Sequence, residues 1–223
     1  MVTGVLPVAL NRAVKLTGFF LGEDKEYEGI MRIHKEIPLE EIKKTIKEKF
    51  IGKIIQLPPV KSRVKRQERE REIKKFEILE RNGKNISFIV ECQGGTYIRK
   101  LVHDLGEALG IGAHMIKLRR IRAGIFKEKD SVKLEDINEK NLKDIIIPAE
   151  IISEVYPVVE IKNEFVNKVL HGAPIDFKFL TKKEKFGKNK IVCIFRKDRF
   201  IGMYRVTNEK DIFAKPEFVL QPL

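Results

Sequence analysis

The chain has 223 residues, 43% of them hydrophobic, which is enough to bury a sizeable core in one or two domains and argues against disorder. Its formal net charge of +13 favours a polyanionic partner, although chains rich in Lys and Glu and without Trp also occur in heat-adapted proteomes. No apolar run approaches the ~20 residues that a membrane span needs and no targeting segment opens the chain, so we expect a cytoplasmic protein without a membrane partner.

The first half of the chain begins with a segment that has the pattern of a loop entering a buried element. Val2-Thr3-Gly4-Val5-Leu6 lacks the charged tail or first helical turn that usually follows a start methionine. Apolar residues then recur at helical spacing between Pro38 and Gly52, which predicts an amphipathic helix over residues 39 to 51. The run from 61 to 71, KSRVKRQERER, is typical of a solvated face, and its net positive sign leaves an RNA-contacting ribbon as the second interpretation.

A β-hairpin is predicted next. The alternating segments EIKKFEILE and ISFIVEC flank Arg81-Asn82-Gly83-Lys84, and Asn-Gly in this setting predicts a type I′ turn. The second strand leads into QGGTYIRKLVHDLGEALG, where apolar residues mark one face of a helix that Thr96 would cap. A strand, a glycine turn and a helix in this order build the wall of a cleft.

Signals weaken from residue 128 to 154, and we place a domain boundary near residue 150. The predicted domains are therefore residues 1–150 and 151–223. The second is expected to contain a strand at 156–161, a short helix at 165–170 ended by Gly172, the strands KIVCIF and RFIGMYRV joined by Lys197-Asp198, and a last apolar stretch, EFVLQPL. This composition resembles a small β-barrel more than a helical module.

The cysteines and histidines give no sign of a disulfide framework or a metal site. Cys92 and Cys193 lie far apart and form no Cys-x-x-Cys pair, and the four histidines lack metal-ligand spacing. We expect two reduced interior thiols and no bound metal.

Arg99 lies in the first turn of its predicted helix, off the apolar face, where the positive end of the helix dipole disfavours a cation. Such an arginine should have an anionic partner, a carboxylate or a phosphate, unless it is an ordinary solvated side chain. Tyr97 and His103 could face the same cleft, although a partly buried structural tyrosine is the commoner case.

Five segments together resemble the TruB/dyskerin family of pseudouridine synthases: VTGVLPVAL, KEYEGIMRIHKE, QLPPVKSRVKRQER, CQGGTYIRKLVHDLGEALGIGAHMIKLRRIRAG and HGAPI. They are most similar to its archaeal, guide-RNA-dependent branch, the catalytic subunit of H/ACA ribonucleoproteins. The resemblance spans nearly the whole chain. It implies an α+β fold, with a mixed, mainly antiparallel sheet in the catalytic domain and a C-terminal PUA domain, a pseudo-β-barrel that binds RNA.

The resemblance also implies a reaction, the isomerisation of uridine to pseudouridine in rRNA or tRNA. The base is flipped out because its reacting atoms are inaccessible in a stack, and it is then detached, rotated and rejoined through carbon 5. Such an isomerisation needs a positioned carboxylate and no cofactor. The implied partners are an H/ACA guide RNA and three small proteins: a zinc-ribbon peptide, a barrel subunit of the glycine/arginine type and a kink-turn binder.

Three residues match the family's reaction site. Tyr27 of KEYEG matches the tyrosine that stacks on the flipped base and is a candidate general base at carbon 5. Arg99 of GTYIR matches the arginine that pairs with the catalytic aspartate, and Leu118 of KLRR matches an apolar residue of the uracil pocket. Without the resemblance, Tyr27 would be a strand-edge tyrosine and Leu118 a plain core leucine.

Other residues match the RNA-contacting parts of the family. The candidates are Lys65 and Arg66 in the basic stretch, Arg119 and Arg120 as phosphate contacts rather than catalytic groups, and His171, Gly172 and Ala173 in the PUA signature. The chain departs from the family at Arg63, where a small residue is usual, and in its shorter, more charged PUA strands. These departures leave the fine RNA contacts open.

The family's catalytic aspartate belongs to a Gly-Thr-Leu-Asp-Pro motif that would end just before Met1, so the resemblance places it outside the chain. Asp24, Glu26 and Asp104 match nothing with that role. We expect the chain alone to be inactive and to need an upstream segment or a separate N-terminal chain. A split or interrupted gene, a decayed paralogue and a truncated reading of an intact enzyme would each explain this. The rival function is a non-catalytic RNA-binding scaffold that uses the PUA tail and the basic ribbon.

Overall fold

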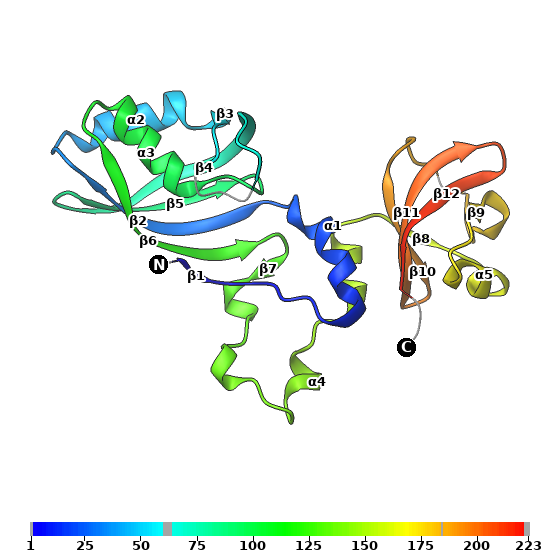
Figure 1. Ribbon diagram of the computed structural model, residues 1–223. Coiled ribbons are helices and arrows are strands. Elements are labelled where there is room, and N and C mark those ends of the chain that lie inside the picture. Colours follow the sequence, from blue (N-terminus) through cyan, green and yellow to red (C-terminus); the bar gives the residue numbers. More distant parts are fainter. Residues whose placement is uncertain (1, 60–63, 184, 221–223) are drawn as a thin grey trace. The chain divides into compact units, whose positions relative to one another are not determined.

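The computed structural model describes residues 2–59, 64–183 and 185–220 (Figure 1). Its contacts divide the chain into two compact units, Met1–Val8 with Thr17–Ser131 and Ala9–Leu16 with Val132–Leu223. The boundary predicted near residue 150 lies within the second of these units.

The first unit is built on a seven-stranded sheet in the order β1-β6-β2-β5-β4-β3, with β7 beside β6 (Figure 1). Its strands are β1 (Val2–Gly4), β2 (Lys25–Ile33), β3 (Gly52–Gln56), β4 (Arg69–Asn82), β5 (Asn85–Cys92), β6 (Ala113–Ala123) and β7 (Phe126–Lys127). Its helices are α1 (Thr17–Leu21), α2 (Leu39–Lys49), α3 (Ile98–Ala108) and the 3-10 turn η2 (Glu128–Asp130). The β1–β6 pair is parallel and the other pairs are antiparallel, which confirms the mixed, mainly antiparallel sheet.

Helices α2 and α3 cover one face of this sheet (Figure 1). Ile42 and Ile46 of α2 and Leu101 and Leu105 of α3 are buried against alternate strand residues such as Phe88. Each fully buried side chain of this size stabilises the fold by about 1.5–3 kcal/mol. The packing fixes which residues of each strand face the helices, and half-buried Tyr27 is among them.

The local predictions in this unit are largely confirmed, with two corrections. The helix expected over 39 to 51 is α2, and the hairpin is formed by β4 and β5. Of the two loop residues only Gly83 has a positive φ (57°), which is the pattern of a type II′ turn rather than type I′. Thr96 is not the cap of α3, because the helix begins one residue after Tyr97 and the Thr96 hydroxyl donates to the Gln93 carbonyl at 2.7 Å.

Strands β3 and β6 were not predicted from the sequence. In β6, AHMIKLRRIRA, four basic side chains obscure the alternation of buried and exposed positions. The strand exists because β2 and β1 pair along its two sides, and bulges in the β2 ladder after Glu26 and Ile30 interrupt the simple period. This strand carries Leu118, Arg119 and Arg120.

The second unit contains a five-stranded sheet in the order β8-β10-β11-β12-β9. Its strands are β8 (Val158–Glu160), β9 (Ile175–Asp176), β10 (Ile191–Arg196), β11 (Arg199–Glu209) and β12 (Ile212–Val219). Its helical segments are η1 (Asn11–Leu16), η3 (Leu134–Asp136), α4 (Leu142–Ile145), η4 (Ala149–Glu154), η5 (Asn163–Phe165), α5 (Val166–Leu170) and η6 (Phe177–Phe179). The predicted strands around 156–161, KIVCIF and RFIGMYRV and the short helix at 165–170 are thereby confirmed as β8, β10, β11 and α5. Strand β9 was not predicted, and the last predicted stretch begins within β12, with residues 221–223 outside the described residues.

The two ends of this second sheet are joined to each other. Ile161, just after β8, forms a bridge with Leu180, just after η6. The Lys162 amide donates to the Phe179 carbonyl at 2.8 Å, on the same seam. The sheet therefore curls into a barrel-like form around a buried core that includes Tyr204.

Both cysteines are buried and free. In the described ranges no helix is long and apolar enough to cross a membrane. No cluster of three or more His, Cys, Asp or Glu side chains that could hold a metal ion occurs in those ranges either.

Candidate functional site

Two of the three predicted reaction-site residues lie on the helix-covered face of the first sheet, at the end where β2 begins. Tyr27 on β2 is directly opposite Arg120 on β6, and Leu118 is opposite Gly29 on β2. Because directly paired residues share a face of the sheet, Tyr27, Leu118 and Arg120 point to the same side. Leu118 is buried in the core of this unit, and Tyr27 packs against that core.

Strand β1 is held against this group in a fixed register. The Arg120 Nε donates to the Val5 carbonyl at 2.8 Å, and the Val5 amide donates to the Arg120 carbonyl at 2.9 Å. Gly4, with φ of 99°, lies opposite Arg120, and a Cβ there would approach the Arg120 carbonyl oxygen to 2.1 Å. Only glycine permits this approach, so β1 is seated directly on β6.

The groups at this end of the sheet are partly removed from water. Burial raises the pKa of Tyr27, and the nearby Arg120 guanidinium only partly opposes this effect. Burial, and next the charge of Arg120, lowers the pKa of Lys25. Burial also raises the pKa of the Cys92 thiol to about 11. At neutral pH the phenol and the thiol are therefore neutral, and the charge next to Tyr27 is positive.

Arg99 comes from the first turn of α3, and a buried side chain fixes where this helix starts. Gln56, at the end of β3, is 2% exposed. Its Nε2 donates to the Tyr97 carbonyl at 3.3 Å, and its Oε1 accepts from the Tyr97 amide at 3.0 Å. Gln56 was not predicted from the sequence, where the only signal was a lone amide within the otherwise apolar run IIQLPP.

The glycine turn before α3 also packs closely against the segment that enters β2. A Cβ at Gly94 would lie 2.5 Å from the Leu21 carbonyl oxygen and 3.0 Å from the Lys25 Nζ. Arg99 itself is exposed and makes no hydrogen bond or ion pair with any residue in the described ranges. The anionic partner predicted for Arg99 is thus not among those residues.

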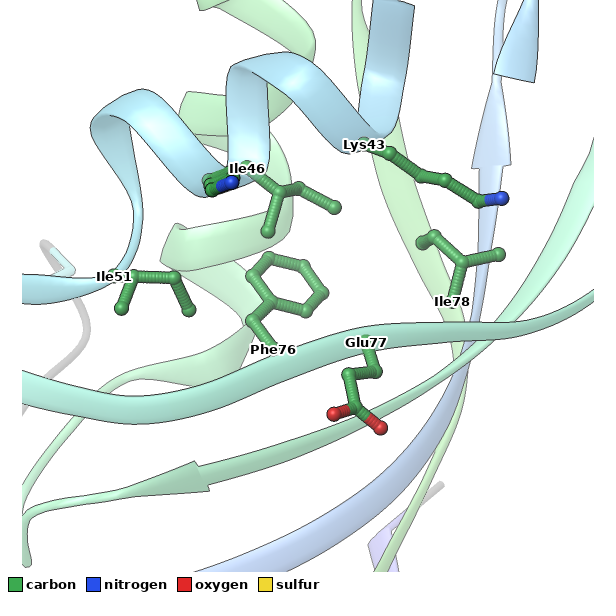
Figure 2. A pocket seen from close by; sticks show the side chains of 7 residues that line it. Lys43, Ile46, Ile51, Phe76, Glu77 and Ile78 are labelled. Carbon is green, nitrogen blue, oxygen red and sulfur yellow. The ribbon is translucent and has the colours of Figure 1, made fainter. Parts of the chain in front are cut away.

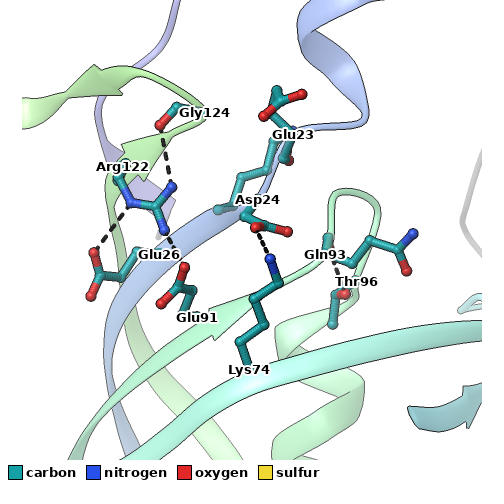
Figure 3. A network of polar contacts seen from close by, with 10 residues as sticks. Glu23, Asp24, Glu26, Lys74, Glu91, Gln93, Thr96, Arg122 and Gly124 are labelled. Carbon is teal, nitrogen blue, oxygen red and sulfur yellow. Dashed lines mark hydrogen bonds and ion pairs between the residues drawn. The ribbon is translucent and has the colours of Figure 1, made fainter. Parts of the chain in front are cut away.

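The acids near the site are already paired with other cations. Arg122 donates to Glu91 at 2.7 Å and lies 3.5 Å from a Glu26 oxygen, and Lys74 pairs with Asp24 (Figure 3). Asp104 of α3 is likewise ion-paired, with the Lys100 ammonium one turn earlier. These contacts tie the strand ends together and engage all three acids that the sequence offered as substitutes for an aspartate.

The predicted RNA-contacting residues fall into three separate places. Lys65 and Arg66 are exposed just before β4, whereas residues 61–63 of the charged ribbon, including Arg63, lie outside the described residues. The Arg119 guanidinium is engaged by both oxygens of Glu128, with Nε at 3.0 Å from Oε2. A phosphate at Arg119 would have to compete with this carboxylate.

The PUA-signature residues belong to the second unit. His171 is exposed after α5, with Nδ1 2.7 Å from the Asn167 carbonyl oxygen. Gly172 has φ of 82° and open space where a Cβ would stand, and the Ala173 carbonyl accepts from the buried Tyr204 hydroxyl at 3.2 Å. The signature therefore forms a turn in which His171 is exposed, Gly172 and Ala173 are half-buried, and the Ala173 carbonyl is bound from the barrel core.

A groove of about 340 Å³ lies between α2 and β4 (Figure 2). Its lining combines apolar side chains with charged ones: Lys43, Ile46, Lys47, Ile51, Phe76, Glu77 and Ile78. None of the predicted site residues borders it. The groove is thus distinct from the site at Tyr27.

Comparison with known proteins gives the family. Residues 1–98 match the model of the TruB family pseudouridylate synthase N-terminal domain, and residues 99–153 match the tRNA pseudouridylate synthase B C-terminal domain. A probable tRNA pseudouridine synthase B from Methanopyrus kandleri is 42% identical over 195 residues, covering 82% of this chain and 57% of the relative. The chain thus spans little more than half the length of that curated relative.

Two solved structures are similar over 99% of the chain. One is the crystal structure of a Cbf5-Nop10-Gar1 complex, with a TM-score of 0.88, 35% identity and 74% of that chain covered. The other is an H/ACA RNP bound to a substrate RNA containing 2′-deoxyuridine, with a TM-score of 0.85, 34% identity and 73% of that chain covered. With both domain models matched and this identity to a solved relative, the chain belongs to the TruB family of pseudouridine synthases.

Proposed function

We propose that this chain supplies Tyr27, Arg99 and Leu118 to an RNA pseudouridine synthase site that is completed by a carboxylate from outside the described residues. The observation that carries the proposal is a charge imbalance. Arg99 and half-buried Arg120 have no carboxylate partner in the described ranges, whereas Asp24, Glu26 and Asp104 are bound to other cations. The family motif that holds the catalytic aspartate would precede Val2, next to Leu118 in the sheet.

In the proposed reaction the flipped uracil stacks on Tyr27 and packs against Leu118, and Arg99 holds the incoming carboxylate. The bond from the base N1 to the sugar C1′ breaks, a bond from C5 to C1′ forms, and the C5 proton is replaced by one at N1. A phenol with the ordinary tyrosine pKa of 10.0 is already protonated at neutral pH, and burial raises the pKa of Tyr27 further. This favours stacking and hydrogen bonding by Tyr27 over the role of a phenolate base.

We further propose that residues 151–223 form a PUA domain that approaches RNA through His171, Gly172 and Ala173. The barrel-like closure of the second sheet and the partly exposed turn at these residues support this assignment. One solved relative is in a complex with Nop10 and Gar1, the other is in an H/ACA RNP bound to a substrate RNA, and the curated relative is named for tRNA. These names support guide RNA, rRNA or tRNA, and small H/ACA proteins as partners. Lys65 and Arg66 would add phosphate contacts.

The second candidate is a non-catalytic RNA-binding scaffold, which is favoured by the net charge of +13 and by the fact that Arg99 has no carboxylate partner among the residues that the structure describes. The two functions are separated by adding an N-terminal segment of the Methanopyrus kandleri relative, with its aspartate or with asparagine in its place. We expect the chain to convert uridine when the added segment carries the aspartate, and not when it carries asparagine. RNA binding that falls steeply with salt, without conversion in either mixture, would favour the scaffold.

A further inference from the structure

Three arginines lie close together on β6, and one differs from the other two. Arg119 and Arg122 are each ion-paired with glutamates. Arg120 lies on the helix-covered face, is half-buried and has no carboxylate partner in the described ranges. A guanidinium that is partly removed from water without a counter-charge costs free energy, so its position calls for an explanation.

The Arg120 side chain acts on two neighbouring strands at once. Its strand lies between β1 and β2, with Gly4 opposite Arg120 on one side and Tyr27 on the other. Its Nε is bound to the Val5 carbonyl at 2.8 Å. Its guanidinium is also close enough to the Tyr27 hydroxyl to favour the ionised phenol, whereas burial and the Cys92 thiol on β5 oppose ionisation. The Arg120 guanidinium therefore connects Val5, just after β1, with Tyr27 in the candidate reaction site.

We propose that Arg120 is a positioning residue that holds the Val2–Val5 segment and the Tyr27 hydroxyl in a fixed relation to each other. The proposal rests on the proposed function, in which Tyr27 meets the base and the segment before Val2 carries the carboxylate. This positioning role differs from the phosphate contact that the resemblance to the family led us to expect for Arg120. A guanidinium whose Nε is bound to the protein backbone on the core side is poorly placed to meet an RNA strand.

The first test follows Tyr27 in the full chain labelled with 3-fluorotyrosine, by ¹⁹F NMR across a pH range. Fluorination lowers the phenol pKa, so that the titration occurs under milder conditions. The chain has four tyrosines, and the signal missing in Tyr27→Phe identifies Tyr27. In Arg120→Met the Tyr27 signal should titrate at higher pH, because a cation that favours the phenolate is gone. The other three signals should stay in place and report an intact fold.

Two further variants separate positioning from a general effect of charge. Arg119→Met removes the neighbouring charge from the other face of the sheet and should leave the Tyr27 titration unchanged. Arg120→Lys keeps the positive charge but lacks the planar guanidinium group. The pH at which Tyr27 titrates should therefore return most of the way to that of the parent chain, whereas the hydrogen bond to the Val5 carbonyl should not be restored. In Arg120→Met and Arg120→Lys the Val5 amide should exchange with solvent roughly ten- to a hundredfold faster, as expected when the charge-assisted hydrogen bond that holds the Val5 carbonyl is lost.

An unchanged Tyr27 titration in Arg120→Met, with the other tyrosine signals in place, would overturn the proposal. So would an equal shift in Arg119→Met, or unchanged exchange of the Val5 amide. None of these readouts involves catalysis. A failure of the proposed function would instead show as a lack of uridine conversion in the completed enzyme, so the two failures are distinguishable.

Discussion

The two hydrogen bonds between the Gln56 side chain and the Tyr97 backbone predict a measurable contribution to the free energy of unfolding. Replacing Gln56 with leucine removes both hydrogen bonds to Tyr97 while keeping a side chain of similar volume. Two neutral hydrogen bonds contribute about 0.5–1.5 kcal/mol each, and a desolvated backbone donor left without its bond costs about 1–3 kcal/mol. The Tyr97 carbonyl still accepts from the Leu101 amide at 3.0 Å, and leucine gains apolar burial. We therefore expect Gln56→Leu to lower the free energy of unfolding by about 2 kcal/mol.

Urea unfolding followed by circular dichroism measures this loss. Lys53→Leu is the matched control on the same strand, because the Lys53 side chain is 73% exposed and its ion pair with Glu70 lies in solvent. Its unfolding free energy should stay within about 0.5 kcal/mol of the parent chain. Equal stability of Gln56→Leu and Lys53→Leu would show that the Gln56 hydrogen bonds do not stabilise the start of α3.

Three further predictions concern packing, pH and RNA. Gly29→Ala should lower the free energy of unfolding by about 1–3 kcal/mol, because the new Cβ would lie 2.4 Å from the buried Phe88 ring. Gly18→Ala is the control, since open space surrounds this position and no loss is expected; thermal melts of the two variants test this. Burial raises the pKa of the Cys92 thiol from 9.0 to about 11. Above pH 9 the thiol ionises in the unfolded chain but not in the folded one, so the free energy of unfolding is unaffected below pH 9 and falls by about 3 kcal/mol as the pH rises to 11. Cys92→Ala should therefore flatten the alkaline fall of stability, and an unchanged slope would contradict this. Glu128→Gln removes the carboxylate that pairs with Arg119, so RNA should bind more tightly and its affinity should depend more steeply on salt. Fluorescence anisotropy measures both effects, and weaker binding would exclude a phosphate contact at Arg119.

The parts of the fold that could be predicted from the sequence depend on local patterns. Helix α2 follows from apolar residues at helical spacing, and the β4–β5 hairpin from two alternating segments around Asn-Gly. The strands of the second unit follow from short apolar runs separated by turn residues. In each case the residues that determine the element lie within it or beside it in the chain.

The parts that could not be predicted depend on contacts between distant segments. Strand β6 exists because two other strands pair with it, and Gln56 reaches Tyr97 across 41 positions of the sequence. The side of the sheet to which Arg120 points depends on the β2–β6 register, which contains two bulges. Resemblance to the family indicated Tyr27 and Leu118 and gave Arg99 its role, whereas the place of Arg99 in the first turn of a helix had already predicted an anionic partner without identifying it.

The central claim is that Arg99 serves a reaction site whose carboxylate is supplied from outside the described residues. Release of tritium from carbon 5 of labelled uridine in RNA tests it most directly, with the chain completed by the aspartate-bearing N-terminal segment. We predict release by the completed parent chain, loss of release in Arg99→Ala, and release retained in Lys100→Ala, which removes a neighbouring charge that is paired with Asp104. Equal release from the Arg99 and Lys100 variants, or release by the chain without the added segment, would contradict the account.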